Sequence, residues 1–96
     1  MFDNLVGTYA CHRIGTDVYA YKVVSNPTPN RIIVTRLEGY QYVDGYATKF
    51  AEVGSGFITL SWRKRTNRWA EVGQSSKYSI WSVGLDKPKA YLDPSF

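Results

Sequence analysis

An alternation of residue type with a period of two constrains the fold of this chain most strongly. Residues 18–25 (VYAYKVVS) and 31–37 (RIIVTRL) are rich in β-branched and aromatic residues, which favour extended strands. Residues 26–30 (NPTPN) lie between them and have the composition of a turn. The two segments therefore predict a β-hairpin.

Similar patterns predict further strands along the chain. Residues 7–14 read as a strand that turns at 15–17, and residues 57–64 and 68–72 read as a second hairpin around 65–67. Residues 47–53 predict a strand that ends at the breaker 54–56 (GSG), although a helix over 46–53 is conceivable. Residues 38–46 are ambiguous, with a possible turn at Asp44-Gly45. Residues 78–84 predict the last strand, and the tail from about residue 85 should be irregular because it carries Pro88 and Pro94.

These segments predict one all-β domain over residues 1–96. Roughly six to seven short strands, with a turn about every 8 to 12 residues, are typical of a small sandwich or barrel. We expect a small curled antiparallel sheet or barrel of the SH3- or OB-like kind, because the chain is only 96 residues long.

The N-terminus lacks a signal-peptide pattern, and no apolar run approaches the roughly 20 residues that span a bilayer. Cys11 is the only cysteine, so an intramolecular disulfide is excluded. We therefore expect a cytoplasmic protein with no membrane partner. Cys11 itself is expected to be a small buried hydrophobe.

Four cations stand between two tryptophans in residues 62–69 (WRKRTNRW). Arg63, Lys64, Arg65 and Arg68 equal the whole net charge of +4. Guanidinium groups hold phosphate through forked hydrogen bonds, so the run predicts a phosphate-binding hairpin tip. Strand alternation directs Trp62 to the core and makes Trp69 its cross-strand partner, although Trp69 is also a candidate for stacking on a ligand. A purely structural hairpin with a solvated tip is the alternative.

Other aromatic and basic residues complete the predicted ligand site. Tyr19 and Tyr21 share a strand face and could stack on a nucleobase, and Arg36 either lines the pocket or extends to its rim. The tyrosines at 40, 42 and 46 are expected in a loop. Exposed tyrosine clusters serve equally well as subunit contacts, so a homo-oligomer is expected.

Catalytic and metal sites have weaker support in the sequence. His12 with Glu71 could form a metal-independent ribonuclease site, in which one group takes a proton and another returns it. One histidine and scattered carboxylates provide no metal-ligand spacing, and no cofactor motif is present. We therefore expect neither a metal nor a cofactor.

Several stretches resemble a group of small, uncharacterised phage- and prophage-encoded proteins. They are residues 17–24 (DVYAYKVV) with 31–34 (RIIV), residues 57–60 (FITL) with Arg63-Lys64 and 68–74 (RWAEVGQ), and the terminal 91–96 (YLDPSF). Residues 65–67 (RTN) stand where that group has a tighter turn. The resemblance implies a phage-type protein acting in the host cytoplasm, where small proteins sequester cyclic nucleotide immune signals or block host enzymes.

The sequence thus favours a non-enzymatic protein that binds a phosphate-bearing aromatic ligand. The ligand would be a nucleotide, such as a cyclic nucleotide signal sequestered against host defence, or single-stranded nucleic acid. A protein–protein module that inhibits a host enzyme is the first alternative, and the ribonuclease is the second.

Overall fold

The computed structural model describes residues 4–74 and 80–92, which form six antiparallel strands in one sheet. The strands are β1 (Tyr9–Ile14), β2 (Asp17–Thr28), β3 (Arg31–Val43), β4 (Tyr46–Arg63), β5 (Arg68–Glu71) and β6 (Trp81–Leu85). Their order across the sheet is β5-β4-β3-β2-β1-β6. Consecutive strands from β1 to β5 are neighbours, and β6 returns to lie beside β1.

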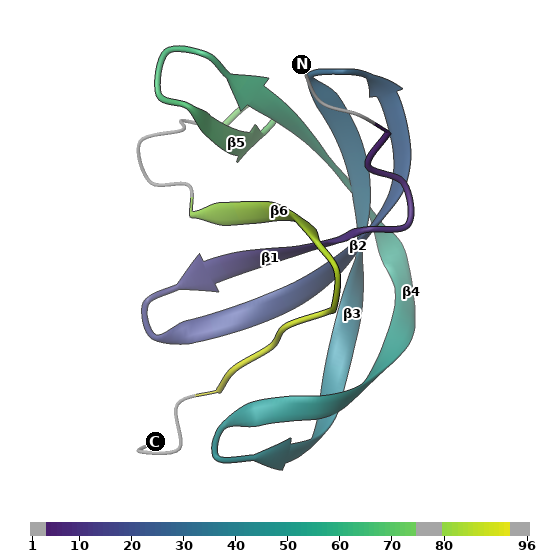
Figure 1. The fold of residues 1–96 in the computed structure, drawn as a ribbon, viewed down its shortest axis with the longest axis vertical. Helices are drawn as coiled ribbons and strands as arrows, with labels where there is room; N and C mark the ends of the chain where they lie inside the picture. The colour runs from purple at the N-terminus through teal and green to yellow at the C-terminus, as the bar shows by residue number, and fades with distance from the viewer. Residues whose placement is uncertain (1–3, 75–79, 93–96) are drawn as a thin grey trace.

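The sheet curls until its two edge strands, β5 and β6, approach each other (Figure 1). No pairing joins these edges among the described residues, so the sheet is curled but not closed into a barrel. The predicted all-β class and the curled antiparallel sheet are confirmed. The strand over residues 46–53, for which a helix was conceivable, is extended. No helix in the described ranges is long and apolar enough to cross a membrane.

Turn chemistry sets the β3–β4 hairpin at Asp44-Gly45, where the otherwise ambiguous residues 38–46 offered a possible turn. Asp44 and Gly45 have φ of 51° and 88° and join the paired residues Val43 and Tyr46. Two successive positive φ values match the right-handed twist of the flanking strands, which is why Asp-Gly is favoured there. The β4–β5 turn runs from Lys64 to Asn67, so Lys64 lies in the turn and not in the strand as expected.

Two strands, β2 and β4, are longer than the breaks in the sequence pattern suggest, because irregularities in pairing absorb the breaker residues. β2 continues through Pro27 to Thr28, with register shifts on either side of Ser25, which are positions where a ladder tolerates proline. β4 continues through residues 54–56, and its register against β3 shifts between Thr35 and Leu37. Gly54 and Gly56 have φ of 68° and 113°, which glycine alone adopts without strain.

Two groups of buried side chains form the core. The larger group fills the inside of the curl and comprises Ala10, Tyr21, Val23, Ile32, Val34, Leu60 and Trp69. The smaller group comprises Ala20, Leu37 and Ala90. Ala90 belongs to the C-terminal segment 89–92, which lies against the starts of β2 and β4. This segment therefore contributes both to the core and to the outer surface described next.

Candidate functional site

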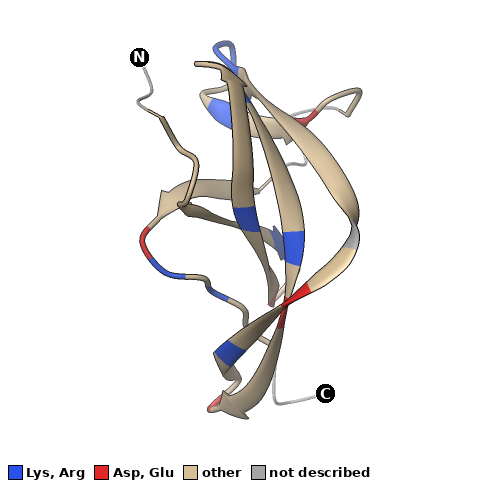
Figure 2. Ribbon diagram, turned by 90° about the vertical axis from the view of Figure 1, so that its right-hand side faces the viewer, with Lys and Arg blue, Asp and Glu red and all other residues tan. Residues whose placement is uncertain are grey.

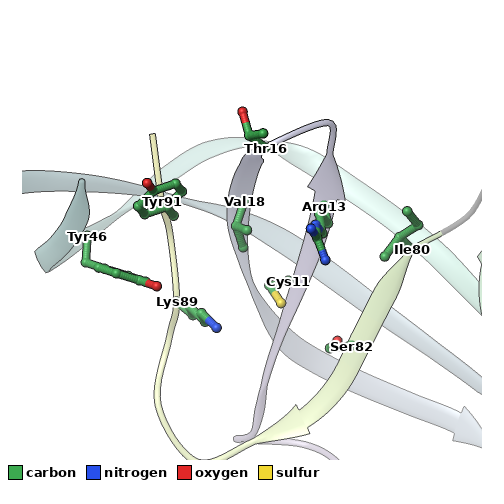
Figure 3. Close-up of a pocket in the computed structure, with 9 residues that line it drawn as sticks. All are labelled: Cys11, Arg13, Thr16, Val18, Tyr46, Ile80, Ser82, Lys89 and Tyr91. Atoms are coloured by element: carbon green, nitrogen blue, oxygen red, sulfur yellow. The ribbon is translucent and has the colours of Figure 1, made fainter. Parts of the chain in front are cut away.

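An open groove of about 500 Å³ lies between the β1–β2 hairpin, the start of β6 and the C-terminal segment 89–92. Its lining residues are Cys11, Arg13, Thr16, Val18, Tyr46, Ile80, Ser82, Lys89 and Tyr91. Figure 3 shows Tyr46 and Tyr91 at one end, Arg13 and Ile80 at the other, and Cys11 between them. The volume falls within the range of about 300 to 1,000 Å³ that is typical of small-molecule sites.

The groove combines positive charge with an aromatic wall. Among the lining residues that the structure describes, Arg13 and Lys89 are charged and none is acidic. The rings of Tyr46 and Tyr91 pack with centroids 4.7 Å apart and planes tilted by 52°. The hydroxyls of Thr16 and Ser82 add uncharged hydrogen-bonding groups. The two cations can attract an anion, and the exposed face of Tyr46 can pack against a planar group.

Backbone hydrogen bonds hold the C-terminal segment in place as the wall of the groove. The Val18 N–H donates to Tyr91 O (2.8 Å), and the Tyr91 N–H donates back to Val18 O (2.9 Å). On the other side, the Ala47 N–H donates to Ala90 O (3.0 Å) and the Leu92 N–H to Gly45 O (2.9 Å). Because side chains of an extended segment alternate, Lys89 and Tyr91 line the groove while Ala90 enters the core.

The tryptophans that bracket the basic run form the expected cross-strand pair. Trp62 and Trp69 are register partners, with ring centroids 5.7 Å apart at an interplanar angle of 65°. Trp69 is only 5% exposed and belongs to the core. Burial leaves almost none of its ring accessible, so a stacking role on a ligand does not fit its position. The geometry therefore favours the alternative in which the two tryptophans only stabilise the hairpin.

The four cations of the run divide between two roles. Arg63 is half-buried and donates hydrogen bonds to neighbouring segments. Its Nε donates to Ser61 Oγ (3.0 Å), and its Nη2 donates to Glu71 O (3.3 Å) and Gln74 O (3.2 Å). Lys64, Arg65 and Arg68 are exposed. The phosphate-binding tip predicted from the run therefore rests on these three side chains, and Arg63 supports the hairpin.

The other predicted site residues do lie together, but away from the hairpin tip. The Arg36 guanidinium stands 4.7 Å from the Tyr19 ring centroid, and Tyr21 pairs with Arg36 across the strands. Tyr21 is 7% exposed, and burial raises the pKa of its hydroxyl. Arg31 begins β3 and pairs with Ser61 near the β4–β5 hairpin tip. Arg36 lies five positions further along β3, which at about 3.4 Å per residue is about 17 Å from Arg31. The predicted set thus separates into two clusters, and neither cluster lines the groove.

His12 stacks on Trp81, with ring centroids 4.3 Å apart and planes within 1° of parallel. Burial lowers the pKa of His12, and the charge of Glu71 acts in the opposite direction. A neutral imidazole can accept a proton at pH 7, and Glu71 is near enough to affect it. The ribonuclease alternative therefore stays a hypothesis. No group of three metal-ligating side chains occurs within the described ranges.

Sequence reasoning did not identify the groove, because its walls come from opposite ends of the chain. Arg13 was a candidate cation in the sequence, expected either to extend to the rim or to line a pocket. Tyr46 was expected in a loop, whereas it begins β4. Tyr40 and Tyr42 likewise lie on β3. Lys89 and Tyr91 belong to a tail that was expected to be irregular. The alternation of Lys89 and Tyr91 with the small apolar Ala90 was the one signal in the sequence that this segment is extended with one buried face.

Searches among known protein families, curated protein sequences and solved structures found no match to this chain. The fold and the groove define it as a small protein built on one curled antiparallel β-sheet with an open, basic and aromatic surface groove.

Proposed function

We propose that this protein binds a small phosphate-bearing aromatic ligand, such as a nucleotide, in the groove and does not transform it. The observation that carries the proposal is that two cations, Arg13 and Lys89, line the same groove as the Tyr46–Tyr91 wall. The two cations suit a phosphate group, and the tyrosine end suits a base. A cyclic nucleotide belongs to this class, and its sequestration is the role that the resemblance to phage proteins would imply.

Isothermal titration calorimetry with the full chain tests the proposal. The panel comprises purine and pyrimidine mononucleotides, cyclic mononucleotides and dinucleotides, and inorganic phosphate alone. A hydrogen bond to a charged group contributes about 1.5 to 3 kcal/mol, so Arg13→Ala and Lys89→Ala should each weaken nucleotide binding about 10- to 100-fold. Lys87→Ala is the matched control, because Lys87 is exposed nearby but does not line the groove.

Two results would refute the groove as the site. One is nucleotide affinity that is unchanged in both Arg13→Ala and Lys89→Ala. The other is binding of inorganic phosphate as tight as that of every nucleotide, which would remove the role of the tyrosine wall. Cleavage of single-stranded RNA by the wild type, abolished in His12→Ala, would instead support the ribonuclease alternative.

One observation favours the alternative of a protein–protein module. The outer half of the β3–β4 hairpin exposes Tyr40 (46%), Tyr42 (40%), Val43 (60%) and Tyr46 (50%). Exposed tyrosines of this kind are enriched in protein interfaces, including those between identical subunits. Sedimentation equilibrium of the wild type and of Tyr40→Ser/Val43→Ser tests self-association through this hairpin. A wild-type monomer at all concentrations would exclude the homo-oligomer.

A further inference from the structure

Two turns meet at one end of the molecule and bring exposed cations together. The β2–β3 turn and the β4–β5 turn pack side by side, because the Trp62 N–H donates to Asn30 O (2.8 Å). Arg31 leaves the first turn, and Lys64 and Arg65 lie in the second. All three side chains are exposed. Figure 2 shows the cations at the β4–β5 turn and an acidic residue in the β3–β4 turn at the opposite end of the long axis.

The β4–β5 hairpin is a stiff support for these charges. The Trp62–Trp69 ring pair joins its strands, and Arg63 fastens β4 to the end of β5 through Glu71 O and to the following turn through Gln74 O. Side chains on a fixed ribbon lose less conformational freedom on binding than those on a loose loop. The tip therefore presents its cations in a preorganised arrangement.

The residue types at this tip distinguish among polyanions. Residues 64–68 (KRTNR) contain no aromatic or apolar side chain, and Trp69 is buried. Binding of single strands relies on exposed aromatic rings on which bases stack. Stable binding to a membrane surface combines basic residues with exposed apolar side chains that enter the bilayer interface. A duplex requires neither, because its bases are already stacked and its phosphates face outward. Its major groove, about 12 Å wide, admits a two-stranded β-ribbon.

We infer that the β4–β5 hairpin tip, with Arg31 beside it, is a docking surface for the phosphate backbone of a nucleic acid duplex. The hairpin enters the major groove, Lys64 and Arg65 contact phosphates on its two sides, and Arg31 contacts the adjoining backbone. Thr66 and Asn67 are the polar side chains at the turn that face the base edges. This surface is separate from the groove of the proposed function and does not depend on it.

Fluorescence anisotropy with the full chain and a labelled 20-base-pair DNA duplex measures this contact. Three phosphate contacts give a slope of about −2.7 in log affinity against log salt, or about a 40-fold loss of affinity between 50 and 200 mM salt. Lys64→Ala/Arg65→Ala should reduce that loss to about 3- to 4-fold and weaken binding at 50 mM. Lys49→Ala/Lys87→Ala removes the same charge elsewhere on the surface and should retain the wild-type slope.

Three results would overturn the inference. The first is an equal effect of the two double variants, which would make net charge the only determinant. The second is tighter binding to the single strand than to the duplex. The third is binding to anionic phosphatidylserine vesicles without binding to the duplex. Arg13→Ala should leave duplex binding unchanged, so failure of this inference and failure of the groove proposal can be told apart.

Discussion

Replacing Arg63 by alanine should lower the free energy of unfolding by about 1 to 2 kcal/mol. The side chain donates three hydrogen bonds, at 3.0 Å to a hydroxyl and at 3.3 and 3.2 Å to two backbone carbonyls. A net contribution of about 0.5 kcal/mol for each, at the low end of the usual range because the bonds are long and partly exposed, gives this total. Urea denaturation followed by tryptophan fluorescence measures the change.

The exposed neighbour provides the control. Arg65→Ala removes the same charge from the adjoining turn and should change stability by less than about 0.5 kcal/mol. Arg63→Lys retains the charge but not the planar fork of donors, so it should recover little of the loss. Equal stability of Arg63→Ala and Arg65→Ala, or full recovery in Arg63→Lys, would refute the assignment of Arg63 as a structural donor.

Three further changes test the packing and the titration of the fold. Gly39→Ala should destabilise by about 1 to 3 kcal/mol in thermal or urea unfolding, because the added Cβ would lie 2.5 Å from the Cβ of Ala47; unchanged stability would show that this contact relaxes freely. Trp69→Ala should destabilise by about 3 to 5 kcal/mol through loss of a buried ring, and a loss below about 1 kcal/mol would contradict its place in the core. The lowered pKa of His12 means that the folded state disfavours its protonation, so the stabilisation present above about pH 6.5 should decline as the pH falls through the folded-state pKa. Denaturation at pH 7.5 and pH 5 should show this decline in the wild type and a smaller one in His12→Gln, and equal declines would assign it to other groups.

The hairpins were predictable because their signals are local. Asp44-Gly45 supplies the two positive φ values of a tight turn, and the alternation before and after it assigns the strand faces. Phe57 and Leu60 lie on opposite faces by strand alternation, and accordingly Phe57 is 71% exposed whereas Leu60 is fully buried. Each of these features depends on residues within one hairpin, so a single sequence is sufficient to derive it.

The continuity of β4 and the position of the groove were not predictable by the same reasoning. Glycines at 54 and 56 predict the end of a strand, but long-range pairing with β3 continues the strand through a bulge there. Arg13 and Lys89 line the same groove only because segment 89–92 docks between β2 and β4. Tertiary contacts decide both features, and residue patterns within a short window do not contain that information.

The most direct test of the groove is a two-dimensional ¹⁵N NMR titration of the full chain with the tightest-binding nucleotide from the calorimetry. Binding in the groove predicts the largest amide shift changes at Cys11, Arg13, Thr16, Lys89 and Tyr91, which line it. The amides of Arg65 and Asn67 at the distant hairpin tip should remain unchanged. Saturable shifts confined to the tip, with none at Arg13 or Lys89, would contradict the proposed site.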